Sequence, residues 1–153
     1  MSGIPAWPSK RPCRNRKTRR APPELLAVHP LGKSPVIEDG ALTLAESGAI
    51  LEYLTERCGA GHLVPERGGQ AHLDYLYWLH YAEGSAMPIL FLKYVLMLLP
   101  RNSPFFVRPI VSMVARRTQA RYTDPQFALH LDFWERTLGA RPWFAGETFT
   151  AAD

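Results

Sequence analysis

The residues best suited to chemistry lie in one short segment, GKSPVIEDGALTLAES, which runs from Gly32 to Ser47. Pro35 heads a predicted strand, and a proline in that place marks a sheet edge because it has no N–H to donate. The next residue, Val36, then offers its backbone N–H and C=O to an extended peptide, as in strand addition. At the other end, Glu46 and Ser47 precede a predicted helix, whose positive N-terminus favours a carboxylate. The segment therefore predicts a site that holds a small peptide by its backbone and by a carboxylate.

The elements that position these residues are a hairpin and a helix. Asp39-Gly40 stands between the short apolar runs Val36–Glu38 and Ala41–Leu44, which predicts a hairpin closed by a type I′ turn. A helix is predicted from about Ser47 to Arg57, because apolar residues recur there with helical spacing. The glycine-rich residues 59–69 follow and predict a linker.

After the linker the composition changes to long helical patterns. Three helices are predicted, over residues 70–99 with a kink at Pro88, over 105–121, and over 124–138 with Asp124 as cap and Gly139 as stop. Near the end of the chain, Thr150 and Asp153 have the spacing of a capping box, with Asp in place of the usual Glu. A further helix start is therefore predicted there.

The basic charge is concentrated at one end of the chain. The first 20 residues hold seven of the 18 basic side chains and no acidic one, so residues 21–153 carry 11 basic and 14 acidic groups. We favour non-native sequence from a displaced start as the origin of the run at Lys10–Arg20. An arm that contacts nucleic acid ranks second, ahead of an Arg-rich transit segment. A nucleic-acid partner is therefore not expected.

Composition also bears on metals, membranes and location. Two cysteines, Cys13 and Cys58, form no disulfide framework, which predicts a reducing, cytoplasmic location. The five histidines show no metal-ligand spacing, so no metal site is predicted. The apolar run at 87–99 contains Pro88 and Lys93 and is too short to span a bilayer. It predicts a buried helix, and no membrane partner is expected.

Several segments resemble one family. Residues 29–54, HPLGKSPVIEDGALTLAESGAILEYL, resemble the second half of the thioredoxin-like domain of cytosolic glutathione transferases. The similar features are Gly-Lys-x-Pro-Val before the hairpin, Leu-x-Glu-Ser at its end and Ala-Ile-x-x-Tyr-Leu in the helix. Residues 75–90 resemble the first helix of the family's helical domain, and residues 143–153 resemble its turn and capping box. The resemblance covers about residues 21–153.

The resemblance implies an α+β, mostly helical fold. After a basic, proline-rich and disordered segment at 1–20, a partial thioredoxin-like domain of hairpin plus helix spans 21–58. A linker at 59–69 then leads to a partial all-α C-terminal domain at 70–153. The family begins with a strand–helix–strand unit of about 30 residues, and the 32 residues before Lys33 show no such pattern. A family member truncated at both ends is therefore expected.

The same resemblance implies a role for each residue of the predicted site. Pro35 matches the family's cis-proline, and Val36 matches the residue whose backbone pairs with the cysteinyl part of glutathione. Glu46 and Ser47 match the residues that hold the γ-glutamyl group, with Ser47 nearest its carboxylate. Lys33 matches a position that reaches the glycyl end.

The implied activity is conjugation of the glutathione thiol to a small electrophile. Glutathione acts as co-substrate, and no other cofactor is expected. Tyr77 and Tyr81, on the predicted first helix of the helical domain, are candidates for the electrophile pocket. The catalytic residue that activates the thiol is unknown, because no Ser or Cys of the first 23 residues sits at a strand-to-helix turn. The family also implies a homodimer. The alternative is a non-catalytic remnant or interaction module with the same fold signature.

Overall fold

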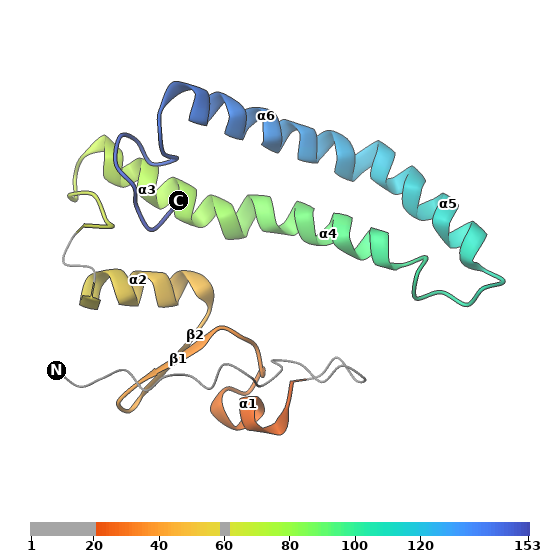
Figure 1. Cartoon of the computed structure of the whole chain (residues 1–153), viewed down its shortest axis with the longest axis horizontal. Coiled ribbons are helices and arrows are strands. Elements are labelled where there is room, and N and C mark those ends of the chain that lie inside the picture. Colours follow the sequence, from red (N-terminus) through yellow and green to blue (C-terminus); the bar gives the residue numbers. More distant parts are fainter. Residues whose placement is uncertain (1–20, 59–61) are drawn as a thin grey trace. The chain divides into compact units, whose positions relative to one another are not determined.

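The structure is a computed structural model in which residues 21–58 and 62–153 are described (Figure 1). The predicted disordered segment at 1–20 and the first part of the predicted linker lie outside the described residues. The chain divides into two compact units, residues 1–53 and 54–153, and the boundary falls within a helix. The predicted domain boundaries remain a prediction, and each unit is described by itself.

The first unit contains a short helix and a hairpin. Its elements are α1 (Pro23–Val28), β1 (Val36–Asp39), β2 (Leu42–Ala45) and the start of α2 (Ser47–Cys58). α1 has no counterpart among the predicted elements. Pro23 occupies the first turn of α1, where a proline is tolerated because that N–H needs no partner in the helix, and Glu24 follows it there. The predicted helix over Ser47–Arg57 is confirmed by α2.

The hairpin turn differs from the predicted one. The last strand pair is Asp39 with Leu42, so the two loop residues are Gly40 and Ala41 rather than Asp39 and Gly40. Gly40 has φ +63, whereas Ala41 is not among the residues with positive φ. A glycine with positive φ in the first loop position fits a type II′ turn, so the predicted type I′ turn is wrong. Glycine takes this φ without steric cost, and an alanine in the second position does not need it.

The second unit is built on two long helices that run side by side in opposite directions (Figure 1). Each consists of two α-helices joined by one π-helical segment. The first comprises α3 (Gln70–Tyr81), η1 (Ala82–Ala86) and α4 (Met87–Leu98). The second comprises α5 (Arg108–Thr118), η2 (Gln119–Thr123) and α6 (Asp124–Ala140).

The π-helical segments explain why the helices continue past two prolines. Pro88 and Pro125 each lie in the first turn of the α-helix that follows a π-helical segment. A proline lacks an N–H and its ring clashes with the carbonyl four residues earlier, and a wider π-helical turn relieves both problems. The predicted helix start is confirmed, because α6 begins at Asp124 with Pro125 in its first turn, but Asp124 is not the cap, since the residues before it are already helical. Asp124 is helical, and its carboxylate pairs with Lys93 of α4. Gly139 is not the stop, because α6 continues to Ala140.

The core of the second unit lies where α3 meets the C-terminal segment. Tyr75 and Leu79 are buried against Ala145. Beside them, Trp78 is only 5% exposed, and its ring stacks on Phe133 of α6 with the centroids 5.0 Å apart. These contacts join the start of the first long helix to the end of the second.

The predicted capping box closes the chain's last turn. The Thr150 N–H donates a hydrogen bond to Oδ2 of Asp153 at 2.9 Å, which confirms one half of the motif. In the other half, the Asp153 N–H donates to the Thr150 carbonyl at 3.3 Å rather than to its side chain. The second carboxylate oxygen, Oδ1, accepts from the Phe144 N–H at 2.6 Å. Asp153 therefore anchors this turn to half-buried Phe144, next to buried Ala145.

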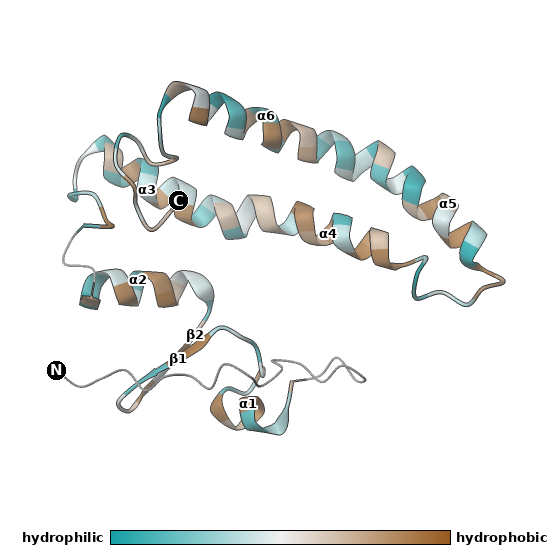
Figure 2. Ribbon diagram, viewed as in Figure 1, coloured by the Kyte–Doolittle hydropathy of each residue, from teal (hydrophilic) through white to brown (hydrophobic). Residues whose placement is uncertain are grey.

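Apolar residues are not confined to the interior of the helices (Figure 2). Ile89 and Leu96 of α4 are buried, whereas Phe91 and Tyr94 are more than half exposed. The prediction of a buried helix over residues 87–99 therefore holds for one face only. No helix among residues 21–58 and 62–153 is long and apolar enough to cross a membrane.

A half-buried ion pair links the two ends of the long helices. Nη1 of Arg141, just after α6, donates to Oδ2 of Asp74 in α3 at 2.5 Å, and Gln70 donates to Oδ1 at 2.8 Å. The bond from Arg141, and then that from Gln70, holds the pKa of the Asp74 carboxyl below its ordinary value, although burial opposes them. Because the folded-state pKa is the lower one, the stabilisation is complete above the unfolded-state pKa of about 3.9 and is lost as the pH falls through the folded-state pKa.

We expect Arg141→Gln to lower the free energy of unfolding by about 1 kcal/mol at pH 7. The difference from the wild type should shrink as the pH falls below about 4. Urea unfolding at several pH values measures both effects. Arg136→Gln is the matched control, because Arg136 pairs with Asp132 on the exposed surface of α6. An equal loss in the control, or a loss that does not depend on pH, would contradict the role of Asp74.

Candidate functional site

The predicted binding residues meet at one end of the hairpin. Val36 is paired with Ala45 at that end, and Pro35 and Glu46 are the next residues on the two strands. The Ser34–Pro35 peptide bond is cis, as the resemblance implied. Ser47 begins α2 directly after Glu46. The antiparallel register thus brings together residues that lie more than ten positions apart in the sequence.

Glu46 has an unusual backbone conformation at the junction of β2 and α2. Its φ is +74, and it is the one non-glycine residue with positive φ in the described part of the chain. For a residue with a Cβ this conformation costs about 1–2 kcal/mol, so an observed case suggests a functional constraint. The Glu46 carbonyl accepts from the Ile50 N–H at 2.9 Å and so starts the helical bonding of α2. The chain thereby passes from strand to helix without a loop.

The site is open to solvent. Pro35, Glu46 and Ser47 are exposed, and Val36 is half-buried. Lys33 is also exposed and stands two residues before Pro35. The N-terminus of the 12-residue α2 adds the positive end of a helix dipole, and no acidic residue lies in its first turn. The arrangement offers a carboxylate at Glu46, a hydroxyl at Ser47 and an edge backbone at Val36 within one short surface.

A side-chain bond holds α2 against the hairpin within the first unit. The Tyr53 hydroxyl donates to Oδ2 of Asp39 at 2.5 Å, which joins α2 to the end of β1 next to the turn. Ile50 of α2 is buried at 6% exposure. The Tyr53 bond therefore ties α2 to the end of β1 within the first unit.

The two tyrosines predicted for the electrophile pocket lie in the second unit. Tyr77 and Tyr81 line two adjoining hollows of about 510 and 340 Å³, and His130 of α6 lines both. The tyrosine rings stack with their centroids 5.8 Å apart. Tyr77 is 51% exposed, whereas Tyr81 is half-buried.

Tyr81 is held by two side chains that the sequence analysis did not single out. Its hydroxyl oxygen accepts from Nε1 of Trp134 at 3.1 Å and is hydrogen-bonded to Nδ1 of His130. Burial raises the pKa of the Tyr81 hydroxyl, and it outweighs the hydrogen bond from Trp134, which acts in the opposite direction. Tyr81 therefore stays protonated at neutral pH and can donate a hydrogen bond. A signal existed in the spacing of His130 and Trp134, which lie one turn apart on one face of a helix.

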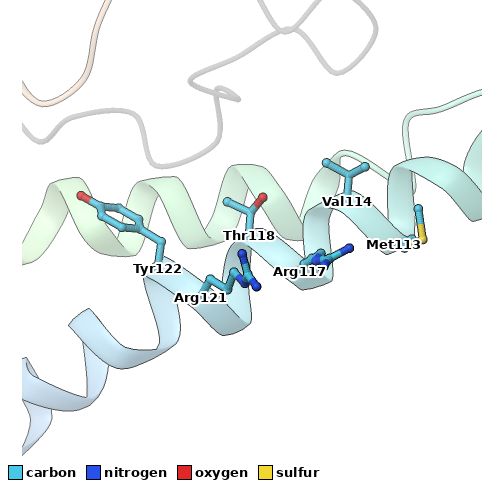
Figure 3. A pocket seen from close by; sticks show the side chains of 6 residues that line it. All are labelled: Met113, Val114, Arg117, Thr118, Arg121 and Tyr122. Carbon is cyan, nitrogen blue, oxygen red and sulfur yellow. The ribbon is translucent and has the colours of Figure 1, made fainter.

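A third hollow lies on α5 and η2 and holds none of the predicted site residues. Its volume is about 350 Å³ (Figure 3). Six side chains of this one long helix line it: Met113, Val114, Arg117, Thr118, Arg121 and Tyr122. The hollow is therefore a feature of a helix surface rather than a cleft between elements.

Metal-binding groups do not gather in the described ranges. No cluster of three or more His, Cys, Asp or Glu side chains there has a geometry that could hold a metal ion. Cys58 is an exposed thiol at the end of α2, and Cys13 lies outside the described residues.

Comparisons with known proteins point to one family. The family model described as glutathione S-transferase, N-terminal domain, matches residues 11–56. Glutathione S-transferase 3 of Schizosaccharomyces pombe is 38% identical over 140 residues, which cover 91% of this chain and 57% of the relative. Glutathione S-transferase 1 of Saccharomyces cerevisiae is 31% identical over 123 residues, covering 76% of this chain and 53% of the relative. The chain thus spans little more than half the length of these relatives.

Solved structures show the same relationship. A glutathione S-transferase from Actinobacillus pleuropneumoniae superposes with a TM-score of 0.65 at 30% identity, covering 91% of this chain and 58% of that one. A sphingomonad glutathione S-transferase complexed with glutathione superposes with a TM-score of 0.57 at 25% identity, covering 83% and 55%. The predicted α+β, mostly helical fold, with a thioredoxin-like part followed by a helical part, is confirmed. The family model, the curated relatives and the solved structures thus all relate the chain to the glutathione S-transferase family.

Proposed function

We propose that the chain binds glutathione at the end of its hairpin and presents the thiol to a small electrophile. One observation carries the proposal. Val36 is paired with Ala45 at the end of the hairpin, and Pro35 on one strand and Glu46 and Ser47 on the other are the residues that follow this pair. The names of the relatives and the glutathione complex of the sphingomonad protein support it.

Each group of glutathione finds a chemical complement among the proposed residues. The Val36 backbone pairs with the cysteinyl part of glutathione. Pro35 has no N–H to donate to another strand, so the strand edge at Val36 stays open to an extended peptide. The Glu46 carboxylate accepts from the α-ammonium of the γ-glutamyl group. The Ser47 hydroxyl and the start of α2 donate to its α-carboxylate. Lys33 pairs with the glycyl carboxylate.

The proposed reaction forms a bond between the glutathione sulfur and a carbon of the electrophile. The thiol loses its proton first, since the thiolate is the nucleophile. A leaving group departs with the electron pair, or the electrophile takes up a proton after addition. Tyr77 and Tyr81 supply an apolar wall for the electrophile, and glutathione is the sole co-substrate, with no metal. We assign no residue of this chain to thiol activation.

A binding assay paired with a turnover assay tests the proposal. Calorimetry with millimolar glutathione should show binding, and an aryl halide should then give a thioether whose formation depends on glutathione. Binding without turnover would make the chain a non-catalytic glutathione-binding module. The absence of binding at millimolar glutathione would rule out both functions. We also propose that the protein forms a homodimer, has a cytoplasmic location and acts in detoxification through this conjugation.

A further inference from the structure

The surface of α5 and η2 carries large apolar side chains next to arginines. We define the arginine face as Ile110, Met113, Val114, Arg117 and Arg121. The three apolar side chains are 61%, 54% and 55% exposed. Both arginines are exposed as well, and they follow the apolar residues along the same helix (Figure 3). Exposed apolar side chains gathered in this way mark a surface that contacts something else.

The arginine face lies on the side of the helix away from its neighbour. Its residues recur at intervals of three and four, which places them on one stripe. Ala115 and Thr123 are buried at 2% and 0% exposure where α5 and η2 pack against α4. The helix therefore has one face packed in the unit and an opposite face that no other described element of the second unit covers.

The loop before α5 extends this surface with two aromatic rings. Phe105 is 82% exposed and Phe106 is 69% exposed, and the rings meet edge to face with centroids 5.6 Å apart. Arg108 follows them and begins α5. The aromatic pair and the arginine face are thus consecutive along the chain.

The charge of this region has one sign. Residues 84–123 hold six basic side chains and no acidic one. Lys93 is paired with Asp124. Within the described ranges, no ion pair involves the arginines of α5 and η2. The region therefore combines exposed apolar side chains with an uncompensated positive charge.

We infer that this region docks on an anionic lipid bilayer, with α5 lying in the plane of the interface. A helix with arginines and exposed apolar residues has the composition of interfacial helices, and arginines near an anionic leaflet each add to the attraction. A second copy of the chain would bring like charges together. A nucleic acid would leave Phe105, Phe106 and the apolar stripe without a partner. This contact is peripheral and needs no membrane-spanning helix. The expectation of no membrane partner rested on the lack of a spanning segment, and this proposal replaces it.

Vesicle sedimentation with the full chain tests this contact. The wild type should bind vesicles of phosphatidylcholine with 30% phosphatidylserine at 0.15 M salt and should bind pure phosphatidylcholine weakly. Arg117→Gln with Arg121→Gln should lower the partition coefficient about 30-fold, which is about 1 kcal/mol for each arginine. Phe105→Ser with Phe106→Ser should lower it about tenfold, because the rings no longer enter the interface. The basic residues 1–20 are the same in every variant, so they do not affect the differences.

The matched control replaces two arginines elsewhere in the second unit, Arg67→Gln with Arg136→Gln. Both are exposed and the net charge changes equally, so this control should lose much less binding. An equal loss would show that net charge alone acts and would overturn the proposal. The proposal also fails if the arginine-face variants bind vesicles normally but lose affinity for soluble polyglutamate, which would indicate an acidic protein partner. A change in dimerisation with unchanged vesicle binding would identify a second copy instead.

Discussion

Glu46→Gln is expected to weaken glutathione binding about tenfold. The change keeps the size of the side chain but removes the charge that accepts from the ligand's α-ammonium. A hydrogen bond to a charged group makes a net contribution of about 1.5–3 kcal/mol to the free energy of binding. The lower end applies here because Glu46 is exposed. Ser47→Ala should cost less, about fivefold, because it removes one hydroxyl and leaves the start of α2 in place. Isothermal titration calorimetry measures both.

Two further variants separate binding from folding. Glu38→Gln is the matched control, since Glu38 is an exposed glutamate of the same hairpin outside the proposed site, and its affinity should not change. Glu46→Gly removes the carboxylate but also relieves the positive φ of +74. It should raise the free energy of unfolding by about 1 kcal/mol while it weakens glutathione binding. If Glu46→Gln binds as the wild type does, or Glu38→Gln loses as much, Glu46 does not hold the ligand.

Trp78→Ala is expected to lower the free energy of unfolding by about 3–5 kcal/mol. The Trp78 side chain is only 5% exposed, and its ring lies 4.5 Å from that of Phe144 and 5.0 Å from those of Tyr81 and Phe133, measured between centroids. Its removal leaves a cavity where α3, α6 and the C-terminal segment meet. Urea unfolding followed by circular dichroism measures the loss.

A second tryptophan provides the control for this loss. Trp143 is 39% exposed and contacts Phe149 at a centroid distance of 5.0 Å. Trp143→Ala should therefore cost much less, about 1 kcal/mol. Trp78→Phe retains part of the packing and should fall between the two, which keeps the test informative if Trp78→Ala does not fold. Equal losses at Trp78 and Trp143 would show that the core does not centre on Trp78.

Local sequence rules determined much of the fold. The apolar spacing predicted α2, and the predicted helix over residues 70–99 appears as α3, η1 and α4. The rules failed where two local signals competed. Asp39-Gly40 is a strong turn signal, yet the strand pairing extends through Asp39 and shifts the turn by one residue. Pro125 correctly predicted the start of α6, yet the preceding π-helical segment joins that start to α5, and Asp124 bonds to Lys93 instead of capping the helix.

The sequence by itself determined which residues of the proposed glutathione site lie together. Pro35 and Glu46 flank one short hairpin, so antiparallel pairing brings both to the same end of it. The predicted turn at Asp39-Gly40 would set Pro35 opposite Leu44, however, and only the observed pairing of Val36 with Ala45 makes Pro35 and Glu46 the next residues on the two strands. The positive φ of Glu46 has no sequence signal, because glutamate rarely adopts it. Only the tertiary structure decided that His130 and Trp134 hold Tyr81, about fifty residues away. Helical spacing tells which side chains share a face, but the packing of two long helices decides which faces meet.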